Sequence, residues 1–404
     1  MTLDVATPVN GVLRGVRVID LTQNVAGPYC TQILGDMGAE VIKIERPVVG
    51  DDTRAWMPTA CGEQSATFLA LNRNKKSLSV DLDQARGREI VKQLVRDSDV
   101  IVHSLKPGSA EARGLGYEDL RAINPKLVYC AISAFGQQGP MRGLPGYDPL
   151  MQAFTGIMSV TGSEGDAPAR VSVSLIDMGT GMWAAMGILA ALREVERSGV
   201  GTTVEASLME TGVGWMTLFI ANYRASGNLP KKMGTAVAMT APYELFEAAD
   251  GAVFIAAGNN RLFRKVCEAL TLPDLPADAR FADNPQRVAH RNDLHRLIEE
   301  RTRELTTQDI ERRLHAHGAP CSAMNNVEQM LASEQVNAAG IVQALPMAPD
   351  DTHRVVGLPF TIAGLRRSQH AAPPALGQHT REMLVSIGYG ENDIDQLVEQ
   401  GVVR

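Results

Sequence analysis

The chain has 404 residues, too many for one ordinary hydrophobic core, so two or three domains are expected. Hydrophobic residues make up 45% and charged residues 21% without any low-complexity tract, which excludes a largely disordered protein. The formal net charge of -7, from 39 basic and 46 acidic residues, argues against a dedicated nucleic-acid-binding protein but leaves room for a local basic patch that binds an anion.

The N-terminal region reads as a strand, a helix and a second strand. Residues 16–21 form a short β-branched run, which predicts a strand, and a loop of small and polar residues at 22–27 follows it. Pro28 suits the first position of a helix, where its missing N–H costs nothing, and Gly38 suits the helix end. A second strand at 41–44 completes a βαβ unit, which implies a parallel sheet.

The same alternation continues for about 200 residues. Further strands are expected at 77–82, 100–102, 127–132 and 203–206, and helices at 84–96 and 179–197. Alternation of this kind is typical of an α/β domain with a doubly wound, Rossmann-like parallel sheet. We place this large domain at 1–224.

The pattern changes after the large domain, where Gly and Pro separate shorter elements. The elements expected here are strands at 243–246 and 253–256 and helices at 262–270 and 291–317. Asp250-Gly251 between the two strands is a strong hairpin turn. We therefore expect a smaller α+β domain at 225–330. The tail at 331–404, with a helix at 380–387, is expected to pack back on the large domain and complete it.

Targeting and metal-binding signals are missing from the sequence. Nothing at the N-terminus resembles a signal peptide, and the most apolar stretch, 182–192, is too short to span a bilayer. The chain is therefore expected to be a soluble, cytoplasmic protein without membrane contact. Its five cysteines are scattered, odd in number and without CxxC spacing, so neither a disulfide framework nor a metal site is expected.

The centre of the presumed catalytic domain contains no histidine, since none of the eight lies between His103 and His290. Histidine is the usual acid or base near neutral pH, so a catalytic relay built on it is not expected there. Serine and cysteine nucleophiles would lack an activating base nearby in the sequence, although distant residues could supply one.

Asp177 follows an alternating apolar run at 171–176, and Gly179 and Gly181 lead into the expected helix. At a helix N-terminus, free N–H groups and the dipole are expected to lower the pKa of this carboxyl group, and the glycines would let a ligand approach. An ionised carboxylate can attack a thioester carbonyl to form a mixed anhydride, whose oxyanion the N–H groups could stabilise. The alternative is that Asp177 only caps the helix, a role worth about 1 kcal/mol.

A ligand-binding crevice is a second hypothesis. Residues 23–28 lie between a strand and a helix N-terminus, where phosphates and nucleotides often bind, but the GxGxxG fingerprint is absent and a plain tight turn remains the alternative. Glu45 weakly resembles the ribose-binding acid of dinucleotide folds. Basic residues at presumed loop positions could hold a 3′-phosphate and a pyrophosphate, or could be solvated surface charges. They are Arg46, Lys75, Lys76, Lys106 and Arg113.

Several segments together resemble the class III CoA-transferase (CaiB/BaiF) family, in family order and over nearly the whole chain. They are LRGVRVIDLT at 13–22, AGP at 26–28, LGDMGAEVIKIER at 34–46, GDDTR at 50–54, NRNKKS at 72–77, KPG at 106–108, GLGY at 114–117, FGQQGP at 135–140, GYD at 146–148, APY at 241–243 and LGQHT at 376–380. Each piece alone is weak, and the resemblance rests on the whole set.

The resemblance implies that Asp177 is the nucleophile, passing through aspartyl anhydride and aspartyl-CoA thioester intermediates. It implies an acyl-CoA donor, a small carboxylic acid acceptor, no tightly bound cofactor, and an interlocked, ring-like homodimer. The expected CoA-binding residues are Val25, Ala26, Arg46, Lys106, Arg113, Tyr147, Asp148 and Gly234. By the same analogy the donor is succinyl-CoA; small dicarboxylates lead as acceptors, with carnitine-like and bile-acid-like acids also open.

The sequence departs from the family pattern at several positions. Ser104-Leu105-Lys106 stands where many members have Asn-Phe-Arg, and the arginine expected at the position of Ala112 sits at Arg113. Val25 replaces a glutamine of formyl-CoA transferases, and their poly-glycine loop is missing at 234–237, which argues against oxalate or formate as substrates.

Three other functions remain to be weighed against the transferase. A 2-methylacyl-CoA racemase needs an acid and a base on both faces of the substrate, but its histidine aligns with Tyr147, whose ordinary pKa near 10 suits that role poorly. An intramolecular CoA transfer would use the same Asp177. A non-catalytic CoA-binding protein would not need an ionised carboxylate at this position.

Overall fold

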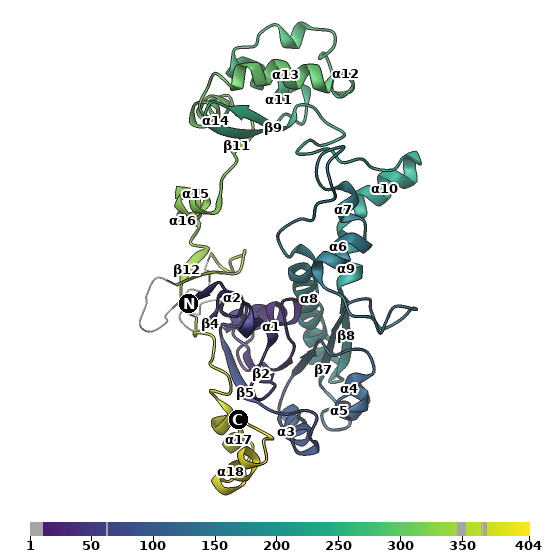
Figure 1. The fold of residues 1–404 in the computed structure, drawn as a ribbon, viewed down its shortest axis with the longest axis vertical. Coiled ribbons are helices and arrows are strands. Elements are labelled where there is room, and N and C mark those ends of the chain that lie inside the picture. The colour runs from purple at the N-terminus through teal and green to yellow at the C-terminus, as the bar shows by residue number, and fades with distance from the viewer. Residues whose placement is uncertain (1–10, 62–63, 346–352, 365, 367–369) are drawn as a thin grey trace, which may run out of the picture. The chain divides into compact units, whose positions relative to one another are not determined.

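The computed structural model describes residues 11–61, 64–345, 353–364, 366 and 370–404 (Figure 1). Its contacts divide the chain into two compact units. The first unit contains the chain up to Ile157, Val171–Ala221 and the C-terminal segment from Gln335, and the second contains Met158–Arg170 and Asn222–Glu334. The segment before α8 thus groups with the second unit, which no local sequence pattern indicated.

A six-stranded parallel sheet forms the centre of the first unit, with strand order β5-β2-β1-β6-β7-β8. The strands are β1 (Arg17–Leu21), β2 (Glu40–Glu45), β5 (Lys75–Ser79), β6 (Val100–His103), β7 (Val128–Ser133) and β8 (Thr202–Ser207). In chain order these are the third, second, first, fourth, fifth and sixth strands, so the chain starts in the middle and winds first to one edge and then to the other. The reversal lies between β1 and β6.

The other strands of this unit are short: β3 (Ala60–Cys61) pairs with β4 (Gln64–Ser65), and β12 (Val342–Ala344) with β13 (Arg354–Val356). Its helices are α1 (Ala26–Asp36), α2 (Ala66–Leu71), α3 (Ala85–Arg96), α4 (Ser109–Ala112), α5 (Tyr117–Arg121), α6 (Asp148–Phe154), α7 (Ile157–Val160), α8 (Leu175–Ser198), α9 (Leu208–Trp215), α10 (Thr217–Ser226), α16 (Glu334–Ala339), α17 (Thr380–Ser386) and α18 (Glu391–Glu399). Three of these helices, α7, α10 and α16, cross a boundary between the two units. A short 3-10 helix covers Asp52–Ala55.

The C-terminal helices pack on the core of the first unit. Met383 and Leu384 of α17 and Ile394 and Leu397 of α18 are buried in the same cluster as Leu94 of α3. Burying each such side chain contributes roughly 1.5–3 kcal/mol, which is enough to hold a segment that is distant in sequence.

The second unit is built on an antiparallel sheet with strand order β11-β10-β9. Its strands are β9 (Tyr243–Ala248), β10 (Gly251–Ala256) and β11 (Cys321–Ala323), and its remaining helices are α11 (Asn260–Leu270), α12 (Asn284–Ala289), α13 (Arg291–Thr302), α14 (Thr307–Ala316) and α15 (Val327–Ala332). The hairpin turn lies at Asp250 as predicted, and the Asp250 carboxylate also accepts a hydrogen bond from the Thr307 N–H.

Two predicted helices have different bounds in the structure. The single helix expected at 291–317 is two helices, because Thr306 caps a new one by accepting a hydrogen bond from the Asp309 N–H. The helix expected from residue 179 begins at Leu175. By length and composition α8 could cross a membrane, but 44% of its most apolar window is buried within the protein.

Candidate active site

A cleft of about 210 Å³ opens in the first unit at the carboxyl ends of β1 and β6, where the strand order reverses. Ligands of open parallel sheets bind at this kind of position because the loops after the two strands diverge there. The lining residues are Gln23–Gly27 after β1, Ser104–Pro107 after β6, Ile132–Ala134 at the end of β7, Leu144–Tyr147, Trp56, Leu208 and Asp177. Asp177 is the one acidic side chain, and Lys106 the one basic side chain, among these.

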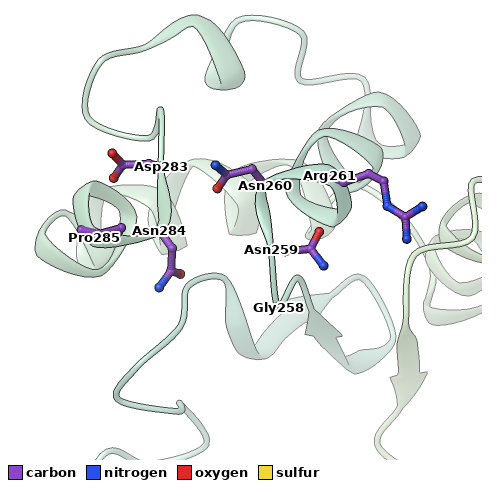
Figure 2. Close-up of a pocket in the computed structure, with 7 residues that line it drawn as sticks. All are labelled: Gly258, Asn259, Asn260, Arg261, Asp283, Asn284 and Pro285. Atoms are coloured by element: carbon purple, nitrogen blue, oxygen red, sulfur yellow. The ribbon is translucent and has the colours of Figure 1, made fainter.

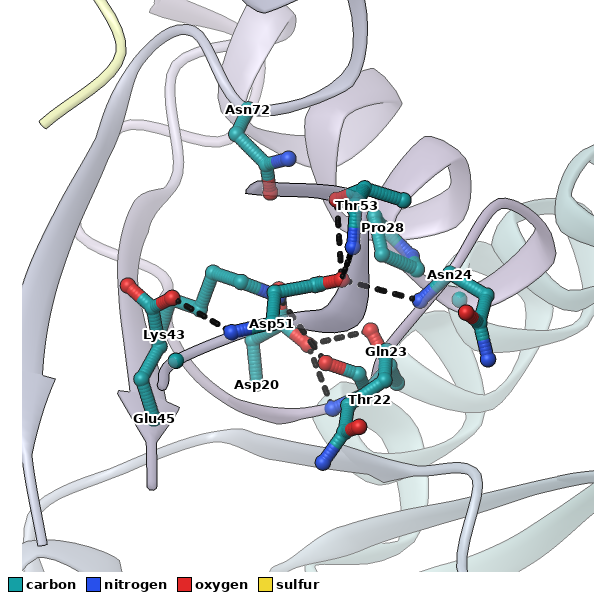
Figure 3. A network of polar contacts seen from close by, with 12 residues as sticks. Asp20, Thr22, Gln23, Asn24, Pro28, Lys43, Glu45, Asp51, Thr53 and Asn72 are labelled. Carbon is teal, nitrogen blue, oxygen red and sulfur yellow. Dashed lines mark hydrogen bonds and ion pairs between the residues drawn. The ribbon is translucent and has the colours of Figure 1, made fainter. Parts of the chain in front are cut away.

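A buried ion pair between Lys43 and Asp51 stabilises the loop after β1, with Nζ of Lys43 and Oδ2 of Asp51 2.8 Å apart. Lys43 Nζ donates to the Thr22 carbonyl (2.9 Å), and Asp51 Oδ1 accepts from the Asn24 N–H (3.2 Å) (Figure 3). Asn24 has a φ of 68°, in the left-handed region that few residues other than glycine and asparagine adopt readily. The ion pair therefore holds the turn that aims the loop at the cleft.

A second buried carboxylate, Asp20 at the end of β1, anchors the same loop to α1. Asp20 accepts from the Thr22 hydroxyl (2.5 Å), the Thr31 hydroxyl (2.7 Å) and Lys75 Nζ (3.1 Å). Burial alone would raise the pKa of Asp20, but the charges of Lys75 and Lys43 and the two hydroxyls outweigh it and lower the pKa to about 2. Asp20 is therefore ionised throughout the neutral range.

Asp177 lies in the first turn of α8 and takes no part in capping it. Ser174 occupies the N-cap position without a side-chain hydrogen bond. The cap comes from Asp148, 3% exposed, whose Oδ2 accepts from the N–H groups of Ile176 (2.7 Å) and Asp177 (3.2 Å). Gln152 holds Asp148 in place by donating to its Oδ1 (2.5 Å). The helix N-terminus is thus satisfied internally, and the Asp177 side chain is left to line the cleft.

Burial and the neighbouring charge of Asp148 raise the pKa of Asp177 to about 7. The expectation of a lowered pKa was wrong, because the N–H groups that would have stabilised the carboxylate already donate to Asp148. At neutral pH the side chain is therefore close to half ionised, and its oxygens are more basic than those of an ordinary carboxylate. A shift of this size in a cleft is typical of a reactive group.

Gly179 and Gly181 serve helix packing, and the expectation that they admit a ligand was wrong. A Cβ atom on Gly181 would lie 2.5 Å from the Ala26 carbonyl oxygen of α1, and one on Gly179 would lie 2.8 Å from the Trp215 ring of α9. The two glycines let α8 lie against α1, its neighbour in Figure 1, and against α9. They bring Asp177 close to the loop that begins at Gln23.

A family model described as CoA-transferase family III matches residues 13–380. The chain belongs to CoA-transferase family III. It is a class III CoA-transferase, as the resemblance implied, and the Asp177 cleft is therefore the candidate active site of an enzyme that exchanges CoA between carboxylic acids.

Similar proteins support this assignment along the whole chain. The succinyl-CoA:glutarate CoA-transferase of Mus musculus is 38% identical over 393 residues, covering 97% of this chain and 90% of the relative. A succinate–glutarate CoA-transferase of Agrobacterium fabrum (strain C58) is 36% identical, covering 93% and 95%. The crystal structure of a CAIB/BAIF family protein from Brucella suis superposes with a TM-score of 0.84 at 35% identity, covering 93% and 99%.

The structure places four of the expected CoA-binding residues of this CoA-transferase in the cleft. Val25, Ala26, Lys106 and Tyr147 all line it with Asp177. Trp56, Ser133 and Leu208 line it too, and the sequence reasoning missed them. Ser133 could have been predicted to line the cleft, because it lies at the carboxyl end of a parallel strand. No local sequence pattern indicated Trp56.

Other expected CoA-binding residues lie outside the lining of the cleft. Arg46 pairs with Asp52, and Arg113 donates to Asp83 (2.7 Å). Asp148 is engaged with α8, and Gly234 lies in the second unit, where its N–H donates to the Gly162 carbonyl (2.9 Å). Their contacts with CoA remain predictions.

Three charged residues considered for ligand binding are structural. Lys75 and Lys76 lie in β5 and not in a loop; Lys75 is bound to Asp20, and Lys76 pairs with Glu40 and Glu382. Glu45 is buried and accepts from Arg54 (2.8 and 2.7 Å) and from the Ser77 hydroxyl (2.7 Å). Because Arg54 and Ser77 occupy its carboxylate, Glu45 does not resemble the ribose-binding acid of dinucleotide folds.

A larger cleft of about 620 Å³ lies in the second unit, lined by Gly258–Arg261 and Asp283–Pro285 (Figure 2). Three of its polar side chains have structural roles. Asn259 caps α11, Asp283 caps α12, and Asn260 accepts from Arg287 (2.8 Å). The Asp177 cleft therefore remains the candidate active site.

Proposed function

We propose that this CoA-transferase moves CoA from succinyl-CoA to a small dicarboxylic acid of the glutarate type, with Asp177 as the nucleophile. The observation that carries the proposal is the position of Asp177, a half-buried carboxylate with a raised pKa in the cleft at the strand-order reversal. Support for the donor and acceptor comes from the relatives, of which several are succinyl-CoA:glutarate or succinate–glutarate CoA-transferases.

The reaction divides into balanced acyl transfers. The Asp177 carboxylate attacks the thioester carbonyl of succinyl-CoA, forming a mixed anhydride and releasing the CoA thiolate. The thiolate then attacks the Asp177 carbonyl, giving an aspartyl-CoA thioester and free succinate. The acceptor carboxylate attacks that thioester, again forming an anhydride and releasing the thiolate. Attack of the thiolate on the acceptor carbonyl yields the new acyl-CoA and restores Asp177.

The cleft offers the groups that these steps need. A carboxylate with a pKa of about 7 is a stronger nucleophile than an ordinary one and still ionises near neutral pH. Lys106 supplies positive charge for an anionic ligand. A racemase is less well supported, because no histidine is among the described residues that line the cleft and Tyr147 is 61% exposed.

We further infer a homodimer, with the first unit as the Rossmann-like part of each subunit and the protein acting in the cytoplasm. Large apolar side chains of the first unit are exposed along three consecutive helices, a pattern that a second copy would cover. They are Met182, Trp183 and Met186 of α8, Val213 and Trp215 of α9, and Leu218 and Phe219 of α10. Sedimentation should give about twice the 43.5 kDa chain mass. A monomer at micromolar concentration would contradict the inference.

Trapping of the intermediate tests the function. The enzyme is incubated with succinyl-CoA, treated with hydroxylamine or with borohydride, and digested for mass spectrometry. Modification of Asp177, dependent on succinyl-CoA, is the expected result. CoA transfer to glutarate without any modification of Asp177, and with activity retained after Asp177→Ala, would remove the proposed nucleophile.

The rate of the first acyl transfer should follow the ionisation of Asp177. Only the carboxylate form attacks, so kcat/KM for succinyl-CoA should fall about tenfold for each pH unit below about 7 and level off above it. A pH series of initial rates with free enzyme checks this. A flat profile between pH 5 and pH 8 would contradict the raised pKa of Asp177.

Asp148→Asn should move the fall of kcat/KM at acidic pH to lower pH values. The substitution removes the negative charge that helps to raise the pKa of Asp177, while the amide oxygen can still accept from the N–H groups of α8. Burial, the larger cause of the raised pKa, remains in this variant. The pKa of Asp177 should therefore stay above that of an ordinary aspartate. The matched control is Asp166→Asn in the second unit, which should leave the pH profile unchanged.

A further inference from the structure

A second cavity of the first unit, of about 630 Å³, adjoins the candidate active site. The two share Val25 and Trp56, and the second cavity is also lined by Ser174, the N-cap of α8, and by Met178, which follows Asp177 in α8. Most of its remaining wall is apolar or small: Ala66, Ala70, Leu71, Val355, Val356, Gly357, Leu358 and Pro359. The space beside the proposed nucleophile is therefore suited to a carbon chain.

Gln32 of α1 places an unpaired amide in this apolar wall. The residue is 2% exposed, and its Oε1 atom has no hydrogen-bond partner among the described residues. Leaving such a group unpaired costs roughly 1–3 kcal/mol, so buried amides are normally satisfied. Since the oxygen and nitrogen of a glutamine amide can exchange places, Gln32 can donate a hydrogen bond to a ligand in the cavity or accept one from it.

Arg354 of β13 supplies an available positive charge to the same cavity. It lines the cavity, and its guanidinium has no hydrogen bond or ion pair with any residue that the structure describes. Arg73, the other arginine of the lining, differs in this respect, because it donates to Asp36 (3.0 Å) and to the Val356 carbonyl (2.8 Å). Arg354 is thus the cation of this cavity that can bind a carboxylate.

We propose that this cavity binds the carbon chain of the dicarboxylic acid, with the far carboxylate on Arg354 and the Gln32 amide as a second donor. The proposal rests on the proposed function, since it assigns the substrate's free end to a site beside Asp177. Succinyl and acceptor groups occupy the cavity in turn, because both carry a carboxylate at the end away from the reacting carbon. Arg354 is therefore the residue that selects dicarboxylic over monocarboxylic acids.

The test compares Arg354→Met with the wild type, using glutarate and pentanoate as acceptors of equal chain length and succinyl-CoA as donor. Loss of a charged hydrogen bond should raise the KM for glutarate at least about tenfold, with little change in kcat, and reduce the preference for glutarate over pentanoate by a similar factor. Gln32→Leu should give a smaller change in the same direction. Arg193→Met, at the exposed end of α8, is the matched control and should behave as the wild type.

Two outcomes would overturn the inference. One is an Arg354→Met enzyme whose preference for glutarate stays within twofold of the wild type, and the other is a wild type that uses pentanoate as well as glutarate. Failure of the proposed function itself is distinguishable, because wild-type enzyme would then give no succinyl-CoA-dependent modification of Asp177. Melting temperatures of all variants confirm that the fold is retained.

Discussion

Asp177→Asn should lower CoA transfer at least about 10³-fold if Asp177 is the nucleophile, as we propose, since an amide cannot perform the attack with which the proposed mechanism begins. The Asp177 side chain makes no hydrogen bond with any residue that the structure describes, and Asp148 rather than Asp177 caps α8. The loss should therefore appear in kcat without loss of folded protein. Initial rates with succinyl-CoA and glutarate, together with circular dichroism, provide the measurement.

The same substitution should stabilise the protein at neutral pH. A folded-state pKa of about 7 against an ordinary value of 3.8 means that the native state holds the proton more tightly, so wild-type stability falls as pH rises between these values. At about 1.4 kcal/mol per pKa unit, the variant should gain up to a few kcal/mol above pH 7 and almost nothing below pH 4. Urea unfolding at pH 5, 6, 7 and 8 follows the difference. A difference in unfolding free energy between variant and wild type that stays constant from pH 5 to pH 8 would show that the buried charge of Asp177 does not cause it.

Lys75→Met should destabilise the first unit by about 3–5 kcal/mol, because it leaves the buried Asp20 carboxylate without its lysine partner. It also removes the donor to the Pro28 carbonyl (2.9 Å) and to the Asn72 side chain (2.9 Å). Since Asp20 anchors the loop after β1, a surviving folded fraction should bind CoA more weakly. Urea unfolding with two-state analysis gives the free energy, and fluorescence titration with CoA gives the affinity.

The adjacent Lys76→Met is the matched control. Lys76 pairs with Glu40 and Glu382 at the surface, and such pairs contribute about 0–1 kcal/mol. Two neighbouring lysines of one strand should thus differ several-fold in their effect on stability, because β5 turns one inward and the other outward. Equal losses from both variants would mean that the buried network does not hold the loop.

The predicted elements of the sheet were close to those of the structure, because strands buried on both faces read as short β-branched runs. The start of α8 was misplaced for a physical reason. Val173 and Leu175 alternate with serines as in a strand, and the cap that allows a helix to begin at Leu175 comes from Asp148. Asp148 lies 28 residues before Ile176, so a local sequence pattern cannot reveal this cap.

Charged residues were the least predictable part of the site. Whether a lysine lies in a loop or inside a strand depends on tertiary partners. Lys75 was expected in a loop, as a ligand contact or a solvated charge, but it lies buried in β5 and is bound to Asp20. Asp177 could be selected as a candidate from the sequence, but its raised pKa could not be predicted, because the pKa depends on Asp148 and on burial. The Gln32 and Arg354 of the second cavity lie far apart in the sequence, and only the fold brings them together.

The bare backbone of Gly181 sets the spacing between α8, which carries Asp177, and α1, which carries one wall of the cleft. Even a single methyl group there would meet the main chain of α1, and a main chain cannot rotate aside as a side chain can. The two helices would have to separate, which would move the Asp177 carboxylate, the nucleophile that we propose, away from the opposite wall of the cleft. In the proposed mechanism, CoA transfer would therefore depend on a glycine whose contribution is the absence of a side chain.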